Sequence, residues 1–198
     1  LGSSLLVLIA TALIGGALGI IAGMLKGIKA RFVGHIFDAF LSLPILLIAI
    51  IISTLMEPSL WNAMFATLFA ILPYFIHAIY RAIQEELKKD YVIMLKLEGI
   101  SNWTLLKTTI LPNITVVYIQ EISRAFIVAV LDISALSFIS LGAQRPTPEW
   151  GAMIKDSLEL LYLAPWTVLL PGFAIIFTIL LSIIFSNGLI KAINQYYE

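Results

Sequence analysis

The sequence contains no cysteine and few charged residues. Without a thiol, the 198-residue chain can form no disulfide, no cysteine-ligated metal site and no thiol-based active site. Charged residues make up 12% of the chain, and because acidic and basic residues balance, no basic surface for nucleic acid is visible. By contrast, 61% of the residues are hydrophobic and the mean hydropathy is +1.02. A soluble domain of this size cannot bury so much apolar surface, so the composition predicts a membrane protein.

Common catalytic motifs are also missing. The chain has no G-x-x-x-x-G-K-[ST] phosphate loop, no G-x-S-x-G elbow and no H-E-x-x-H zinc motif. His35 and His77 lie far apart, and neither has an acid cluster of metal-ligand spacing nearby. We therefore expect no catalytic residue and no metal site, and interpret both histidines as packing or interfacial residues. The chain is predicted not to be an enzyme.

Long apolar runs are abundant. A helix needs about 20 apolar residues to cross about 30 Å of hydrocarbon. We expect an all-α polytopic bundle with five spans in this sequence. The predicted spans are Leu5–Met24, Phe40–Met56, Leu60–Tyr80, Ile114–Leu141 and Trp166–Ile190.

Lysines and arginines in the short loops predict the orientation, because they are enriched on the cytoplasmic side. Most of them fall on one side of the predicted spans: Lys26, Lys29, Arg31, Arg81, Lys88, Lys89, Lys96, Lys107 and Lys191. Arg145 and Lys155 fall on the other side. We therefore expect the C-terminus in the cytoplasm and the first residue outside. Trp61, Trp150 and Trp166 then lie at the outer boundary, where aromatic anchors are expected.

The longest polar stretch between spans runs from Tyr91 to Asn113 and reads YVIMLKLEGISNWTLLKTTILPN. Good helix formers and charge pairs predict a helix over Arg81–Leu97. Gly99 follows, at the C′ position where a left-handed conformation is needed and glycine adopts it without penalty. The stretch therefore begins as a helix followed by a sharp turn.

The second half of this stretch predicts another short helix. Ser101 is a suitable N-cap for a helix over Asn102–Ile110. Pro112 is expected to end that helix and to start the next span, because proline lacks a backbone donor. A helix–turn–helix of this kind can act as a rigid lever at the inner surface. The alternative is an amphipathic loop that rests on lipid headgroups.

This stretch resembles the cytoplasmic EAA loop of binding-protein-dependent ABC permeases, in which a glycine precedes an Ile-Leu-Pro ending. The resemblance implies that residues 81–113 dock on a separate ATPase subunit. Ile93, Met94 and Leu95 replace the Glu-Ala-Ala of the family, so the docking surface is expected to be more apolar than usual. The implied coupling residues are Tyr91, Lys96, Gly99, Ser101, Trp103, Leu111 and Pro112.

The rest of the chain, residues 1–198, resembles the dipeptide and oligopeptide branch of the same family. His35–Ile50 is similar to a stretch in which an Asp precedes a Pro-containing span. LDISALSFISLGAQRPTPEWGAM at 131–153 is similar to the outer end of a later span. GAQRPTPEWGAM and APWTVLLPG at 164–172 are most similar to a permease subunit of the Sap peptide transporters of Gram-negative bacteria. Six spans are usual in the family, so a first span is expected to be missing ahead of Leu1.

The resemblance implies a multi-pass protein of the bacterial inner membrane. Its implied partners are membrane lipid, a sister permease subunit and two cytoplasmic ATPase subunits, and a periplasmic substrate-binding protein is left open. ATP and Mg²⁺ would be bound by the ATPases, and this chain would bind no cofactor. Sap systems are associated with antimicrobial-peptide resistance, peptide uptake and, in some bacteria, putrescine export. The implied cargo is therefore a peptide, including cationic peptides, or a polyamine, and the direction of transport stays open.

Three charged residues, Glu121, Arg124 and Asp132, lie inside the fourth predicted span. Charges in the membrane are costly, so we expect them to face a partner or a water-filled space. At about 100° per residue they share one face, which suggests a largely acidic wall of the translocation path that attracts cations. The alternative is an ion pair between Glu121 and Arg124 with a structural Asp132.

Gly15, Gly19 and Gly23 form a small-xxx-small stripe on the first span, which allows close helix packing. The stripe can pack within this chain or against a sister permease. A different class of function, an ion channel or a gradient-driven carrier for a cation, would use the charged face of the fourth span. Such carriers often contain inverted repeats, and none is visible here. An intramembrane enzyme is disfavoured because Glu121 and Asp132 lie about three turns apart.

Overall fold

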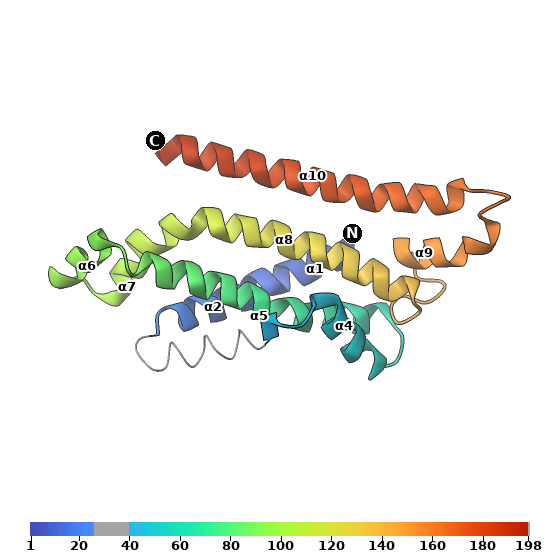
Figure 1. The fold of residues 1–198 in the computed structure, drawn as a ribbon, viewed down its shortest axis with the longest axis horizontal. Coiled ribbons are helices and arrows are strands. Elements are labelled where there is room, and N and C mark those ends of the chain that lie inside the picture. Colours follow the sequence, from blue (N-terminus) through green and yellow to red (C-terminus); the bar gives the residue numbers. More distant parts are fainter. Residues whose placement is uncertain (26–39, 198) are drawn as a thin grey trace.

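The computed structural model describes residues 1–25 and 40–197 (Figure 1), and this part of the chain is helical without any strand. The long helices run side by side along one axis. The elements are α1 (Gly2–Ala10), the π-helical turn η1 (Thr11–Gly15), α2 (Gly16–Gly23), α4 (Ile45–Thr54), α5 (Leu60–Glu86), α6 (Asp90–Leu97), α7 (Asn102–Leu105), the π-helical turn η2 (Leu106–Ile110), α8 (Leu111–Phe138), α9 (Trp150–Asp156), the 3₁₀ turn η3 (Leu158–Leu160) and α10 (Trp166–Tyr197).

Within the described residues, four continuous helical stretches are long and apolar enough to cross a membrane: Gly2–Gly23, Leu60–Glu86, Asn102–Phe138 and Trp166–Gln195. They confirm the predicted all-α polytopic class and coincide with four of the predicted spans.

The prediction that Phe40–Met56 forms a helix across the whole membrane is wrong. Within this range the apolar helix is α4, which has ten residues, and a short turn lies at the start of the range. The backbone is extended at Pro44, with φ −61° and ψ 137°, so the helix begins only after the proline. Ten residues rise about 15 Å, which is half of the hydrocarbon thickness.

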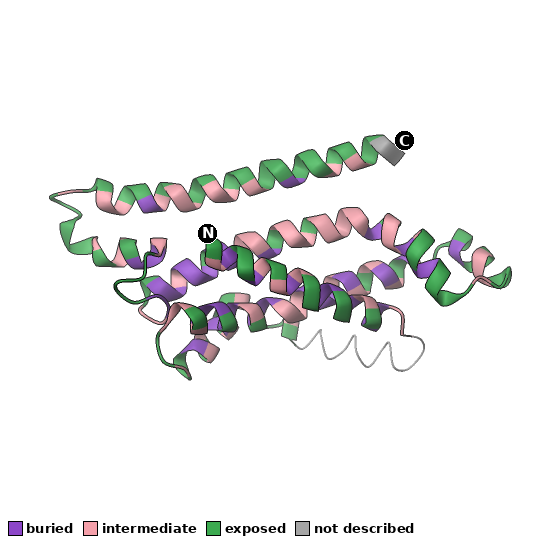
Figure 2. Ribbon diagram, turned by 180° about the vertical axis from the view of Figure 1, so that it is seen from behind, coloured by how far each residue is buried: buried purple, intermediate pink, exposed green. Residues whose placement is uncertain are grey.

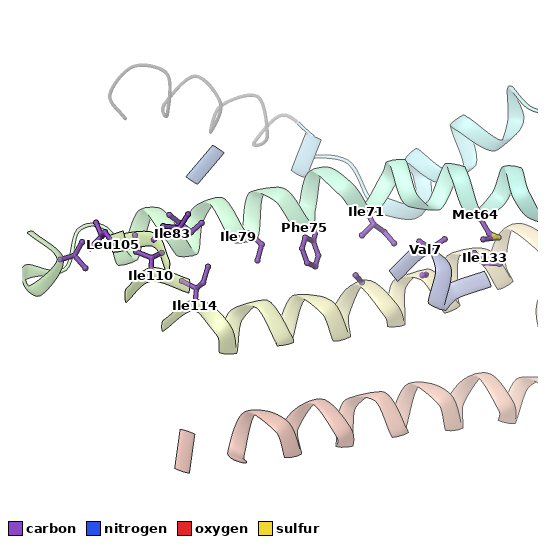
Figure 3. Packing of buried hydrophobic residues seen from close by; sticks show 14 residues of the cluster. Val7, Met64, Ile71, Phe75, Ile79, Ile83, Leu105, Ile110, Ile114 and Ile133 are labelled. Carbon is purple, nitrogen blue, oxygen red and sulfur yellow. The ribbon is translucent and has the colours of Figure 1, made fainter. Parts of the chain in front are cut away.

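Helix α5 lies at the centre of the bundle and packs against α2, α4 and α8. Figure 2 shows that the buried residues gather where these helices meet. One hydrophobic cluster follows α5 from Met64 to Ile83 and continues into Ile110 and Ile114 at the start of α8 (Figure 3). The core therefore extends without a break from the spans to the helix–turn–helix segment.

The glycine stripe of the first span lies against α5, so its contact in the structure is within the chain. The facing pairs are Gly15 with Phe75, Gly19 with Ile79 and Gly23 with Ile83. A Cβ atom added at Gly19 would lie 2.8 Å from the Cβ of Ile79, closer than packed atoms allow. Hydrogen instead of a side chain lets the two helix backbones approach.

We expect Gly19→Val to destabilise the bundle by about 1–3 kcal/mol, because the new side chain overpacks this contact. The carbonyl oxygen of Ile76, 3.2 Å from the added Cβ, adds a second obstacle that cannot rotate away. Thermal unfolding in detergent measures the effect. Gly188→Val on α10 is the matched control, since no heavy atom lies within 4 Å of its added Cβ. Equal melting temperatures for the two variants would contradict the packing argument.

Helix α10 lies at the edge of the bundle and contacts mainly α8 and α9. Only 6% of its apolar stretch is buried, which leaves most of its surface for lipid or another subunit. Its C-terminal end lies at the same end of the bundle as α6 and α7, whereas α9 lies at the other end (Figure 1). The helix–turn–helix segment and the C-terminal end therefore share one side, as the loop charges predict.

Candidate functional site

The turn after α6 has the conformation that the glycine predicts. Gly99 has a φ of +86°, in the left-handed region. Its amide donates to the carbonyl oxygen of Lys96 at 3.1 Å, and the amide of Ile100 donates to that of Leu95 at 3.3 Å. These two bonds form a Schellman motif, which satisfies the last carbonyl groups of α6. The turn that ends α6 is therefore fixed by backbone hydrogen bonds.

The second helix of the segment begins at the predicted cap and ends elsewhere. The Oγ of Ser101 accepts a hydrogen bond from the amide of Thr104 at 3.2 Å. Helical structure then covers Asn102–Ile110 and runs on into α8, so the prediction that Pro112 ends this helix is wrong. The π-helical turn η2 directly precedes α8 and loosens the ordinary bonding pattern there, so the missing donor of Pro112 is tolerated.

The predicted helix over Arg81–Leu97 is also interrupted. Helix α5 ends at Glu86 and α6 begins at Asp90, and between them Lys89 has an extended backbone with φ −69° and ψ 143°. The side-chain bonds of Glu86 lie at this break.

The carboxylate of Glu86 is the centre of a hydrogen-bonded cluster at the base of the segment. Its residue is 5% exposed. Its Oε1 accepts from the hydroxyl of Tyr91 and from the Nδ2 of Asn113 at 3.0 Å, and its Oε2 pairs with the Nζ of Lys89 at 2.7 Å. The Nδ2 of Asn113 also lies 2.8 Å from the Tyr91 hydroxyl. The cluster joins the end of α5, the start of α6 and the first turn of α8.

Two members of this Glu86 cluster, Glu86 and Asn113, were missed by sequence reasoning. Glu86 resembles the neighbouring solvent-exposed acids, and Asn113 lies 27 residues further along the chain, so no local pattern pairs them. Tyr91 was predicted as a coupling residue, and the structure shows its hydroxyl bonded inside the Glu86 cluster. A buried carboxylate that is fully paired holds its partners in one geometry, because an unpaired charge there is costly.

Buried apolar side chains pack the helix–turn–helix segment against α5 and α8. Val92 of α6, Leu105 of α7 and Ile110 of η2 are each fully buried at 0% exposure. They belong to the cluster that contains Ile83 of α5 and Ile114 of α8 (Figure 3). The segment is therefore packed onto two spans and does not hang free from them.

The outer surface of the segment is apolar and uncovered. Met94 is 65% exposed, Leu97 82% and Trp103 72%, and Ile93 is also exposed. We call these four residues the docking face. Ile93 and Met94 stand where the family pattern has Glu and Ala, so the expected increase in apolar surface is realised here. A patch of this kind marks a contact with lipid or with another protein.

The three charged residues of the fourth span lie in different surroundings. The Nη1 of Arg124 lies 3.4 Å from the Oε1 of Glu121, so the ion pair forms; the Glu121 side chain is 13% exposed and that of Arg124 73%. Asp132 is buried at 6% exposure, and its Oδ2 has no hydrogen-bond partner in the structure. Glu121 and Arg124 line one cavity, and Asp132 is not among its lining residues.

Other predicted features lie elsewhere. Lys26, Lys29, Arg31 and His35 fall outside the described residues. His77 is buried in α5 with its ring 6.1 Å from that of Tyr80, which fits the packing role. No group of histidine, aspartate and glutamate side chains with metal-binding geometry occurs in the part of the chain that the structure describes.

Residues 15–197 match the family described as "Binding-protein-dependent transport system inner membrane component". The chain belongs to this family. It is 87% identical over 198 residues to the "Peptide transport system permease protein SapC" of Haemophilus influenzae, covering 100% of this chain and 67% of that protein. The identity to SapC of Escherichia coli O6:H1 is 45% over 192 residues, covering 97% of this chain and 65% of that protein. The chain thus spans about two thirds of the length of these curated relatives.

Further relatives confirm the dipeptide branch and the fold. The "Dipeptide transport system permease protein DppC" of Escherichia coli K12 is 36% identical over 160 residues, covering 81% of this chain and 53% of that protein. A solved structure titled "Inward facing conformations of the MetNI methionine ABC transporter" superposes with a TM-score of 0.72, covering 97% of this chain and 91% of the other. At 12% identity, that likeness shows that the transmembrane fold is shared.

Proposed function

We propose that the chain is the transmembrane permease subunit of an ABC transporter that moves peptides across the bacterial inner membrane, with separate ATPase subunits as the source of energy. The docking face carries this proposal, because it places exposed apolar side chains on a segment that is fixed to two spans. Family membership and the printed names of the peptide-permease relatives support it.

The coupling mechanism follows from the rigidity of the segment. An ATPase that holds the docking face displaces α6 and α7 as its dimer closes. The Glu86 cluster passes this displacement to α5 and α8, and the unbroken helix from Asn102 to Phe138 carries it toward the far side of the membrane. In this proposal ATP and Mg²⁺ bind to the ATPases, and this chain supplies the lever and half of the translocation path beside a sister permease.

The cargo is proposed from the relatives and not from a charged wall. Glu121 is paired with Arg124, and Asp132 does not line the cavity that these two residues line, so the proposed cargo does not depend on the charges of α8. Peptides, including cationic antimicrobial peptides, follow from the Sap and dipeptide permeases. Polyamines remain a second candidate through the Sap resemblance alone, and the need for a periplasmic binding protein stays open.

Reconstitution of the full-length protein in proteoliposomes, with its sister permease and ATPases, tests the function. We expect labelled peptide to accumulate only when ATP is present on the ATPase side. Peptide or cation flux through the chain without ATPases would instead indicate the channel or gradient-driven carrier and would contradict the proposal.

The proposed orientation predicts which introduced cysteines react with an impermeant thiol reagent. We expect Thr147→Cys to react in intact spheroplasts, and Lys89→Cys and Gln195→Cys to react only after permeabilisation. The sequence described here has no cysteine of its own, so the background is clean. Labelling of Lys89→Cys in intact spheroplasts would reverse the orientation and remove the docking face from the cytoplasm.

A further inference from the structure

A cavity of about 210 Å³ lies between α5 and α8, beside the residues that lead into α4. Its polar lining consists of Tyr74, His77 and Arg81 from α5 and of Glu121 and Arg124 from α8. The remaining wall is apolar. The cavity is smaller than the roughly 300–1,000 Å³ pockets that hold whole drug-sized ligands, so it suits one end of a larger molecule.

The charges that line this cavity do not balance. Among the described residues, the lining includes two guanidinium groups, those of Arg81 and Arg124, and one carboxylate, that of Glu121. Arg81 has its own partner in Glu85, but that pair spans 3.8 Å with both side chains about two-thirds exposed at 65% and 67%, so it contributes little. The described part of the lining therefore carries an excess of positive charge.

Arg124 lies in a helical stretch that is long and apolar enough to cross a membrane. Arg124 lies near the middle of α8, ~20 Å from its first residue. Its side chain is nevertheless 73% exposed in the isolated chain. A charged side chain at this depth must face water or another protein, because contact with acyl chains costs several kcal/mol. We therefore expect the exposed part of Arg124 to face water or another protein, such as the sister permease.

We infer that this cavity is a subsite for the terminal carboxylate of a peptide in transit; the inference rests on the proposed peptide function. A guanidinium binds a carboxylate through two parallel hydrogen bonds. The ammonium group of lysine does not offer this geometry. Glu121 holds the Arg124 side chain at 3.4 Å, a loose pair that an incoming carboxylate can share or replace. The charges of Glu121 and Arg124 cancel, and the guanidinium of Arg81 supplies the positive charge that attracts an anion. A lipid phosphate is the other source of the same anionic chemistry.

Transport by the reconstituted full-length complex tests the subsite with one peptide in two forms, a free acid and its C-terminal amide. We expect the wild type to take up the free acid with at least a tenfold higher kcat/KM. Arg124→Gln and, separately, Arg81→Gln should raise the KM for the acid about tenfold and leave that for the amide unchanged. Arg124→Lys should recover only part of the loss. Arg145→Gln, at an exposed arginine outside the cavity, is the matched control and should change neither.

The possible results separate the inference from the proposed function. Equal uptake of acid and amide by the wild type would overturn the carboxylate subsite while peptide transport stands. No uptake of either form would overturn the peptide function itself. If the arginine variants affect both forms equally, and the effect disappears in vesicles without anionic lipid, the cavity holds a lipid phosphate and the inference is wrong. If Arg124→Gln does not accumulate, Arg81→Gln, whose side chain is exposed, still decides between these results.

Discussion

Gly99→Val is expected to abolish ATP-driven transport while the chain still inserts into the membrane. The φ of +86° at Gly99 is strained for any L-residue and most of all for a β-branched one, at about 1–2 kcal/mol or more. No heavy atom lies within 4 Å of the added Cβ, so the whole effect comes from the backbone. Relief of the strain breaks the Schellman bonds and turns α7 away from α6, so that the docking face is divided.

Transport in proteoliposomes and co-purification of the ATPase measure this prediction. Gly172→Val and Gly188→Val on α10 are matched controls, since both have open space around the added Cβ without a positive φ. Gly99→Ala should give an intermediate loss because it lacks the β-branch. Wild-type transport by Gly99→Val at equal expression would remove this turn from the coupling mechanism.

Glu86→Ala is expected to reduce transport strongly by releasing α6 from the spans. It removes the acceptor of Tyr91 and Asn113 and the partner of Lys89, at a site that is only 5% exposed. Loss of a buried partner costs about 1–3 kcal/mol, which corresponds to a roughly 5- to 150-fold shift between the held and released positions of α6. The Asn113 amide then keeps only the Tyr91 hydroxyl as an acceptor.

Amide hydrogen exchange of α6 reports this release directly, and transport reports its consequence. Glu85→Ala is the matched control, because that neighbouring acid is exposed and pairs only loosely with Arg81. Glu86→Gln should retain much of the function, since its amide oxygen still accepts from Tyr91 and Asn113. Unchanged exchange in Glu86→Ala would show that the hydrophobic contacts of Val92 and Leu105 alone hold α6.

Local features of the segment could be predicted from the sequence because neighbouring residues determine them. Gly99 at positive φ and Ser101 as an N-cap each depend on side chains within a few positions. The end of the second helix could not be predicted in this way. The effect of Pro112 depends on η2, a π-helical turn without a clear signature in composition.

Features that depend on tertiary contacts could not be predicted. The bond between Glu86 and Asn113 joins helices that are adjacent only in the folded bundle. Helical angles placed Glu121, Arg124 and Asp132 on one face, but α8 is surrounded by α1, α4, α5, α9 and α10, and different neighbours cover its two halves. Asp132 is therefore buried while Arg124 is exposed. Gly19 and Gly23 were predicted to allow close helix packing from the sequence. Only the structure shows that α5 is the helix they pack against.

The most direct measurement of the central claim is photo-crosslinking from the docking face in the assembled transporter. A photoreactive amino acid at Leu97, which is 82% exposed, should crosslink to the ATPase subunit. The same amino acid at Tyr162, which is 96% exposed, should not. The segment between α9 and α10, which contains Tyr162, lies at the other end of the bundle (Figure 1). Crosslinks from Leu97 that change in yield when ATP is added would fit a docked lever. Crosslinks from Leu97 to lipid alone, or ATPase crosslinks from Tyr162, would contradict the account.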